Sequence, residues 1–484
     1  MRIGIALAGA ALVSLVVTSG IGEARRRRVR VLDTGVTVQA VLPPLPAGWP
    51  TRLELGAQDS PGGAAALRAA ANFAFRYQYL AGGVNTGSGW ATWNANGDFA
   101  RYYIQDSVAN GITPVFSYYQ IRQSSPGGAQ YEPDGVYNNM QNTSTMTSYY
   151  NDVKLFMQKA GAFPGNTVVL HFEPDLWGYM EQHSTSDDAA TVPAKVAATG
   201  LPELAGLPNN VSGFARAIDK LRDTYAPNVV LAYHTSVWGT GSDILYSNPS
   251  DATVDTLATR AGNFFNSLQG GFDIAFTDQL DRDAAYKQIV DGNPNAWYDS
   301  ADYGRSARFV GKFVSVAQKR MVLWQIPLGN TKMRAQNNTW GHYQDNHVEW
   351  LLDEPARTHL TDFVNNGVVA LMFGGGASGT TCACDAQGDG VTNPAPINGN
   401  TATSLSADDD GGFFDQKAAA YYAAGAMPFS GAAPTPTATA TRSATSTPTS
   451  TLTATRTPTA TATRTPTPTP DVHLPANETI VAIP

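Results

Sequence analysis

Short apolar runs alternate with amphipathic segments along residues 50–430 of the chain. Eight of these runs are rich in β-branched and aromatic residues and are too short for typical helices, so we predict that they are strands. The predicted strands are residues 52–56, 75–80, 113–118, 168–172, 229–233, 272–276, 321–326 and 368–373.

The segments between these runs have helical periodicity. In residues 211–221, for example, Phe214, Ile218 and Leu221 fall on one face of a helix. Strict alternation of strand and helix in one domain predicts a (β/α)8 TIM barrel, with bounds of 45–430. The alternative is a doubly wound open sheet, but no glycine-rich phosphate loop follows the first strand.

The fourth run ends abruptly in acidic residues. Pro174 stops strand pairing where Glu173 and Asp175 begin, and alternation along an extended chain places these two side chains on the same side. In parallel α/β folds, chemistry sits at this end of the strands. A glutamate in an apolar setting has a raised pKa, so we predict that Glu173 is a general acid.

Other acids follow further strand ends. Glycoside hydrolysis needs two carboxyl groups on opposite sides of the scissile bond. Asp278 after the sixth strand is the preferred partner of Glu173, and Asp175 is the third catalytic candidate. Asp281 and Asp283 fit the start of a helix better. The remaining acids of the predicted rim are Asp59 and Asp345.

Six of the nine tryptophans fall in loops after predicted strands, including Trp297. Exposed indole rings stack well on the C–H faces of sugars, although some of these rings are expected to pin long loops to the barrel instead. The predicted substrate contacts are Trp90, Trp93, Trp177, His234, Trp238, Gln325 and Trp340.

The composition favours a large folded domain. The chain has 484 residues, of which 43% are hydrophobic and 15% charged, and its net charge of −8 argues against nucleic acid as a partner. The two cysteines, Cys382 and Cys384, fit a small strained disulfide, a metal site or free thiols. No cofactor is predicted.

Both ends of the chain differ from this domain. Residues 1–24 predict a secretory signal peptide, while the basic cluster 25–28 leaves an uncleaved anchor as the alternative. Residues 431–470 are a Thr/Pro-rich, low-complexity linker that cannot bury a core, followed by a short tail over 471–484. We therefore expect a disordered linker and a secreted protein, with cell-surface attachment through the linker as an option.

The predicted strand four ends in Phe172-Glu173-Pro174. Together with the predicted export, the aromatic rim and the Thr/Pro-rich linker, this motif makes the chain resemble the secreted (β/α)8 glycoside hydrolases of the large retaining clan. The resemblance implies an acid/base glutamate in an Asn-Glu-Pro motif at this position and a nucleophilic glutamate at the end of strand seven. The chain departs from this pattern at Phe172, where the clan has asparagine, and at Gln325, where the clan has the nucleophilic glutamate. Because an amide cannot form the glycosyl ester, Asp278 or Asp175 would have to serve as base or nucleophile.

The sequence thus predicts a glycoside hydrolase acting on a polysaccharide. A non-catalytic carbohydrate-binding or cell-surface barrel is the alternative favoured by the missing acid on strand seven. A metal-dependent hydrolase or deacetylase is a further alternative, because His171, Glu173 and Asp175 alternate along one strand and His234 ends the next.

Overall fold

The structure is a computed structural model that describes residues 42–280, 282–289, 291–293, 295–331, 344–374 and 413–429. The chain divides into two units, Met1–Val41 and Leu42–Pro484, and every described residue belongs to the second. Several predictions lie outside the described residues: the signal peptide, the basic cluster, the linker, the tail, Asp281, Trp340, Cys382 and Cys384.

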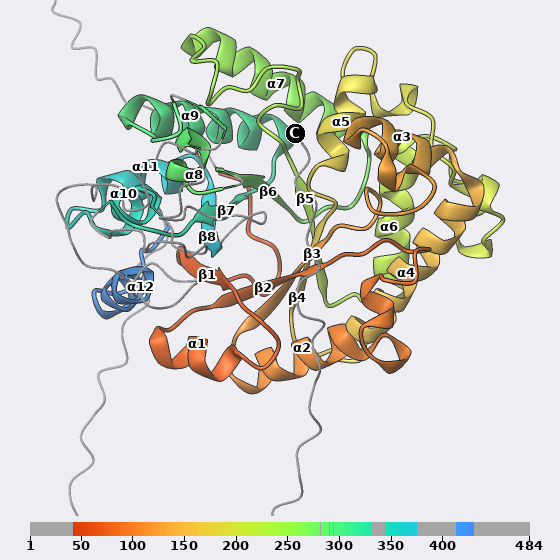
Figure 1. Cartoon of the computed structure of the whole chain (residues 1–484), viewed down its shortest axis with the longest axis horizontal. Coiled ribbons are helices and arrows are strands. Elements are labelled where there is room, and N and C mark those ends of the chain that lie inside the picture. The colour runs from red at the N-terminus through yellow and green to blue at the C-terminus, as the bar shows by residue number, and fades with distance from the viewer. Residues whose placement is uncertain are drawn as a thin grey trace, which may run out of the picture. The chain divides into compact units, whose positions relative to one another are not determined.

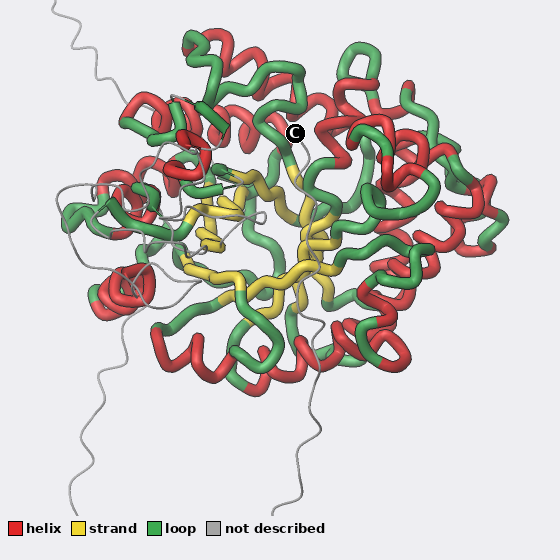
Figure 2. The backbone as a smooth tube through the Cα atoms, in the orientation of Figure 1, coloured by secondary structure: helices red, strands yellow, loops and turns green. Residues whose placement is uncertain are grey.

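Eight parallel strands close into a barrel in the order β1 to β8, with β8 paired to β1. Figure 2 shows the strands as a ring with the helices around it. The prediction of a (β/α)8 barrel is therefore confirmed. The strands are β1 (Glu54–Gln58), β2 (Phe75–Leu80), β3 (Thr113–Tyr118), β4 (Val168–Phe172), β5 (Val229–His234), β6 (Ile274–Asp278), β7 (Met321–Pro327) and β8 (Val368–Gly374).

Helices separate the strands along the chain (Figure 1). The α-helices are α1 (Ala64–Ala70), α2 (Asp98–Ala109), α3 (Glu132–Gln141), α4 (Thr143–Gly161), α5 (Leu176–His183), α6 (Val211–Tyr225), α7 (Asp251–Ser267), α8 (Ala284–Ile289), α9 (Ser300–Ala317), α10 (His347–Leu352), α11 (Thr358–Asn365) and α12 (Phe413–Ala423). Short 3-10 helices are η1 (Trp90–Thr92), η2 (Ala95–Gly97), η3 (Gly127–Ala129), η4 (Ala189–Thr191), η5 (Ala197–Thr199) and η6 (Pro202–Leu204).

The predicted strands agree with the observed ones to within two residues at their starts. β1 begins at Glu54 rather than at Arg52, because Arg52 forms an isolated antiparallel bridge with Pro428. β6 begins at Ile274, after Asp273, whose carboxylate accepts hydrogen bonds from the Leu231 amide and the Arg222 guanidinium. Contacts with residues distant in the sequence therefore accompany both differences.

Helix α6 shows how the sequence pattern sets the packing. Asn210 caps the helix by accepting a hydrogen bond from the Gly213 amide at 2.9 Å. Phe214, Ile218 and Leu221 are buried, as predicted. This apolar face is needed because both sides of a parallel barrel sheet are covered, so the helix must bury its contact stripe against the strands.

The C-terminal segment pins the first strand. The Tyr421 hydroxyl of α12 donates to the Leu53 carbonyl at 2.6 Å, and the Tyr422 hydroxyl accepts from the Leu55 amide at 3.0 Å. Phe414 packs against Phe373 of β8, with ring centroids 4.5 Å apart. Helix α12 therefore covers the β8–β1 junction at which the barrel closes.

Candidate active site at the barrel mouth

Glu173 lies directly after β4 and is fully buried. Its Oε1 accepts three hydrogen bonds, from the amides of Gln120 (3.0 Å) and Ile121 (2.9 Å) and from the hydroxyl of Tyr149 (2.7 Å). Tyr149 belongs to α4, outside the strands, so the carboxyl group is held between this helix and the loop after β3. Glu173 therefore joins three elements of the scaffold.

The backbone explains this position. Glu173 has φ of +50°, a left-handed conformation that costs a non-glycine residue roughly 1–2 kcal/mol. The strand ends at Phe172, and Asp175 already has helical angles as the N-cap of α5. The expectation that Glu173 and Asp175 share one side was therefore wrong, because the extended conformation does not continue to residue 175.

Burial raises the pKa of Glu173 to about 7, against the opposing effect of its hydrogen bonds from Tyr149 and the two amides. The raised pKa agrees with the direction that we predicted for Glu173 from the sequence. However, the side chain has no exposed surface in this structure. The catalytic role of Glu173 stays a prediction: its Oε1 holds the loop after β3, while its Oε2 has no hydrogen-bond partner.

Asp278 at the end of β6 has the access that Glu173 lacks. Its side chain is 22% exposed, and its Oδ1 lies 3.3 Å from His234 Nε2 at the end of β5. Since Oδ1 itself is buried, Oδ2 is the oxygen left to face the mouth. Asp278 therefore combines a buried oxygen close to His234 with an exposed part of the side chain.

His234 cannot contact a substrate directly, because it is 1% exposed. Its Nδ1 lies 3.0 Å from Nε2 of His171, a fully buried residue of β4. The predicted substrate contact at His234 is thus corrected. The structure places the ring behind Asp278 instead.

Asp175 is partly exposed at the start of α5. Its charge lies close to the phenols of Tyr119 and Tyr179, whose pKa values are raised first by burial and then by Asp175. The Ser236 hydroxyl after β5 reaches the carbonyl of Pro174 at 3.5 Å, so the loops after β4 and β5 adjoin. Asp175 therefore belongs to the mouth, on the side of β4.

Two predicted sugar-stacking rings are in the core instead. Trp90 and Trp177 are fully buried. The Trp90 indole donates to Asp152 Oδ1 at 2.7 Å, and the Trp177 indole donates to the Phe172 carbonyl at 2.8 Å. Both predictions are corrected: these rings hold their loops against the barrel, the role that was expected for some tryptophans.

Other aromatic rings at the mouth remain accessible. Trp93 is 43% exposed and stands edge-on to Phe99, with centroids 4.8 Å apart. Trp238 is partly exposed and packs at 4.9 Å against Tyr179. Tyr131, which the sequence analysis missed, is 68% exposed. Its position before a helical segment gave no signal that distinguished it from other loop tyrosines.

Gln325 of β7 stands where a nucleophile was expected. It has φ of +54°, and its amide donates to the Tyr79 hydroxyl at 2.8 Å. The side chain is 7% exposed, so its predicted contact with substrate is restricted to a small surface. The neighbouring Trp324 forms part of the lumen, 5.8 Å from Tyr79.

The remaining acids of the predicted rim have structural partners. Asp59 pairs with buried Arg76 at 2.8 Å. Asp345 accepts hydrogen bonds from His347 Nδ1 (2.7 Å) and from the amide of Ala284 (2.8 Å). Asp283 accepts from the amide of Tyr286 at the start of α8, so the helix-start interpretation is confirmed for Asp283.

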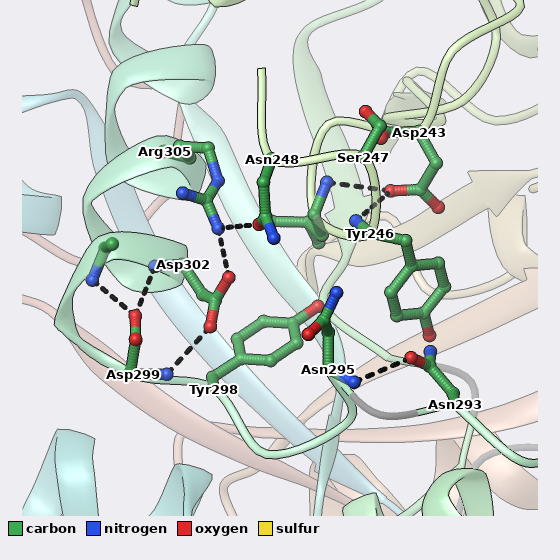
Figure 3. A network of polar contacts seen from close by, with 12 residues as sticks. Asp243, Tyr246, Ser247, Asn248, Asn293, Asn295, Tyr298, Asp299, Asp302 and Arg305 are labelled. Atoms are coloured by element: carbon green, nitrogen blue, oxygen red, sulfur yellow. Dashed lines mark hydrogen bonds and ion pairs between the residues drawn. The ribbon is translucent and has the colours of Figure 1, made fainter. Parts of the chain in front are cut away.

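The segments after β5 and β6 form a network of polar contacts with the start of α9 (Figure 3). Asp243 accepts hydrogen bonds from the amides of Leu245 (2.8 Å) and Tyr246 (3.2 Å). Burial, followed by the charge of Asp278, raises the pKa of Asp243 despite these bonds. Arg305 of α9 joins Asn248 to Asp302, which fixes the segment after β5 against α9.

Within the described ranges, no three His, Cys, Asp or Glu side chains are grouped so that they could hold a metal ion. The residues of the predicted alternative metal site do not form one group, because Glu173 is hydrogen-bonded to Tyr149 while His171 and His234 are hydrogen-bonded to each other.

Within the described residues, no helix has both the length and the apolar character needed to cross a membrane.

Comparisons with known proteins give a likeness of fold. No protein-family model and no curated protein matches the chain. A modular endo-β-1,4-mannanase of glycoside hydrolase family 26 from Cellulomonas fimi is 9% identical with a TM-score of 0.41, covering 76% of this chain and 70% of the mannanase. The exo-β-1,4-mannosidase Op5Man5 from Opitutaceae bacterium strain TAV5 is 10% identical with a TM-score of 0.41, covering 78% of this chain and 61% of that enzyme.

A family 6 enzyme from Orpinomyces sp. Y102 is 14% identical with a TM-score of 0.29. The match covers 55% of this chain and 65% of the Orpinomyces enzyme, slightly less than two thirds of its length. At these identities the likeness concerns the barrel alone, so function has to be argued from the site itself.

Proposed function

We propose that this chain is an inverting glycoside hydrolase that acts on a polysaccharide, with Asp278 as the general base and Asp175 as the general acid. The observation that carries the proposal is the carboxylate of Asp278, which has one oxygen beside His234 Nε2 and the other facing the mouth. A carboxylate with an oxygen open to solvent is suited to taking a proton from water.

The topology supports an inverting route. β5 is the only strand between β4, which precedes Asp175, and β6, which ends in Asp278. Two interstrand spacings place the backbones of β4 and β6 about 9–10 Å apart, nearer to the separation of an inverting pair than to that of a retaining pair. Inverting enzymes hold their carboxyl groups about 6.5–9.5 Å apart to leave room for water, whereas retaining enzymes need about 5–5.5 Å.

In the proposed reaction, Asp278 Oδ2 accepts a proton from water as the water oxygen forms a bond to the anomeric carbon. The glycosidic C–O bond breaks on the opposite face, and Asp175 gives its proton to the departing oxygen. Both carboxyl groups return to their starting states by exchange of one proton with solvent. Trp93, Trp238 and Tyr131 supply partly exposed rings for the flanking sugars.

The proposal includes export of the protein. Residues 1–24 have the pattern of a signal peptide, and residues 431–470 have the composition of an extended spacer that could hold the barrel away from a cell surface.

The test is reducing-end release from a panel of plant, fungal and bacterial polysaccharides. Wild type is expected to cleave at least one of them, and Asp278→Asn and Asp175→Asn to lose activity by about a hundredfold or more. NMR of the first products should show the anomer opposite to that of the substrate. Retention of configuration, or full activity in either variant, would contradict the proposal.

A non-catalytic sugar-binding barrel is the second candidate, because β7 supplies the amide of Gln325 where the retaining clan has an acid. It predicts that all polysaccharides stay intact while one of them binds and quenches tryptophan fluorescence. In that case Asp278→Asn should bind as wild type does.

A further inference from the structure

Three accessible aromatic rings gather on one side of the barrel mouth. Trp238 from the loop after β5 packs against Tyr179 of α5, with ring centroids 4.9 Å apart, and both rings are partly exposed. Tyr131, directly before α3, is 68% exposed. The pKa of the Tyr179 phenol is raised first by burial and then by the charges of Asp175, Glu132 and Tyr131, so these groups lie within electrostatic range of it. We call Trp238, Tyr179 and Tyr131 the aromatic surface.

The elements that carry this surface are packed together. Tyr137 of α3 stacks on His183 of α5, with ring centroids 4.5 Å apart, and the two helices lie side by side in Figure 1. The side-chain amide of Gln182 on α5 donates to the Trp238 carbonyl at 3.3 Å. The rings therefore stand on a common support formed by α3, α5 and the loop after β5.

Gly178 gives Trp238 its place on α5. A Cβ atom at residue 178 would lie 2.7 Å from Cη2 and Cζ3 of the indole ring, which is closer than side chains pack. Glycine is less favourable than alanine inside a helix. Its presence at this position is explained by the ring above it, and a larger residue would push that ring out of position.

Trp238 differs from the other tryptophans in loops after strands by its indole N–H. Within the described ranges, no protein group accepts a hydrogen bond from this N–H, and the nitrogen reaches solvent. An accessible ring with a donor at its edge is suited to a sugar, because the face contacts C–H groups while the N–H meets a hydroxyl. The indole N–H groups that donate to protein oxygens instead are those of Trp90, Trp93, Trp177 and Trp297.

Asp175 determines the side of the scissile bond on which the aromatic surface lies. It is the N-cap of α5, and the amide of Tyr179 one turn later donates to its carbonyl at 3.2 Å. Residues four apart lie on the same face of a helix. In the proposed reaction Asp175 protonates the departing oxygen, which belongs to the sugar on the reducing-end side of the bond. The part of the chain that leaves with this oxygen is therefore nearest to Tyr179 and Trp238.

We propose that Trp238, Tyr179 and Tyr131 bind the leaving-group part of a polysaccharide chain. The assignment to the leaving group rests on the proposed function, whereas the binding of sugar by this surface does not. A substrate with sugars on the leaving side then gains binding that a substrate without them lacks. The aromatic surface would thus make the protein selective for bonds inside a chain.

The first experiment measures binding without cleavage. It uses the full chain with Asp278→Asn and ¹⁵N-labelled tryptophan, and hexasaccharides prepared from each polysaccharide of the panel. The indole N–H signal of Trp238, identified by its loss in Trp238→Phe, is expected to shift with at least one hexasaccharide, while the signals of buried Trp90 and Trp177 stay in place. A Trp238 signal that no hexasaccharide shifts overturns the proposal.

A pair of glycine variants controls this experiment. Gly178→Ala adds a methyl group beneath Trp238 and should weaken hexasaccharide binding by about tenfold. Gly304→Ala adds the same group to α9 at a position with no atom within 4 Å and should leave binding unchanged. Equal affinity in the two variants would contradict the role of the ring that Gly178 accommodates.

The second experiment tests the side of the bond. An oligosaccharide of the cleaved polysaccharide is compared with the matching glycosyl fluoride, in which the C–F bond breaks and fluoride leaves without any sugar. Trp238→Ala should lower kcat/KM for the oligosaccharide by about tenfold and change that for the fluoride by less than about twofold. Tyr102→Ala, which removes a 47% exposed ring of α2, is the matched control and should alter neither. Equal losses on both substrates would overturn the assignment to the leaving group.

The two ideas fail separately. If neither polysaccharide nor glycosyl fluoride is cleaved but a hexasaccharide shifts the Trp238 signal, the proposed function is wrong and the aromatic surface stands as a sugar-binding site. If a polysaccharide is cleaved and Trp238→Ala cleaves it as wild type does, the role of the aromatic surface is wrong.

Discussion

Glu173 and Asp278 both follow a barrel strand, yet their surroundings are opposite. Glu173 has three hydrogen-bond donors on one oxygen and no exposed surface. Asp278 has one imidazole beside one oxygen and 22% of its side chain exposed. The scaffold holds one oxygen of Glu173, whereas the carboxyl group of Asp278 reaches the surface of the mouth.

This difference shows that a perturbed pKa alone does not identify a catalytic acid. Burial raises the pKa of Glu173 to about 7, a value suited to acid catalysis near neutral pH. The same burial leaves Glu173 without exposed surface in this structure. Access and orientation therefore decide between the two carboxyl groups, and each substitution below tests one side of the comparison.

The largest effect is expected at Asp278. Asp278→Asn keeps the size of the side chain but removes the base, so we expect kcat/KM to fall by about 10² to 10⁴-fold. Glu173→Gln keeps an acceptor oxygen at a site without exposed surface and should retain activity within a few fold. Initial rates of reducing-end release measure both. The reverse pattern would restore Glu173 as the catalytic acid.

Glu173→Gln should instead change how stability depends on pH. In the folded protein the pKa of Glu173 is about 7, raised from the ordinary 4.5, so between these values the folded state holds a proton that the unfolded state releases. Wild type should therefore lose stability as pH rises through this window, by roughly 3 kcal/mol relative to the variant. Urea unfolding at pH 5 and pH 8 measures this difference, and a constant offset between the two proteins would contradict the burial of an ionisable carboxyl group.

Tyr149→Phe should destabilise the fold by about 1–3 kcal/mol, because it removes a donor from a buried carboxyl group. Tyr150→Phe is the matched control, since the neighbouring hydroxyl on α4 donates to a neutral acceptor, the Lys195 carbonyl. The loss should be larger for Tyr149 at pH 8 than at pH 5. Equal losses at both pH values would show that Glu173 stays neutral throughout.

The strands were predictable from the sequence because their pattern is local. Apolar runs of five or six residues and intervening helical periodicity defined all eight strands, since burial on both sides of a parallel sheet leaves few polar positions. Asp283 was also correctly predicted as a helix start from its position alone. These features depend on neighbours within a few residues along the chain.

The site was less predictable because its side chains are held by distant partners. Tyr149, 24 residues before Glu173, donates a hydrogen bond to that carboxyl group, and the positive φ of Glu173 ends the extended pattern that the prediction assumed. A signal for the lumen was present in the sequence: Ser117 and His171 are polar residues inside otherwise apolar strands. Their alignment with His234 depends on the register of three strands.

The smallest expected effect separates accessible from buried indole rings. Trp93→Ala should weaken polysaccharide binding by several fold with little loss of stability, because its ring is 43% exposed and free on that side to stack on a sugar. Trp177→Phe should do the opposite, because it removes a buried hydrogen bond to the Phe172 carbonyl without altering the mouth surface. Isothermal titration with a cleaved or inert polysaccharide fragment, paired with thermal unfolding, measures both quantities. If Trp93→Ala binds as wild type does while Trp177→Phe loses affinity at unchanged stability, the division of the tryptophans by exposure is wrong, and the ring that meets the sugar must be sought beneath the rim.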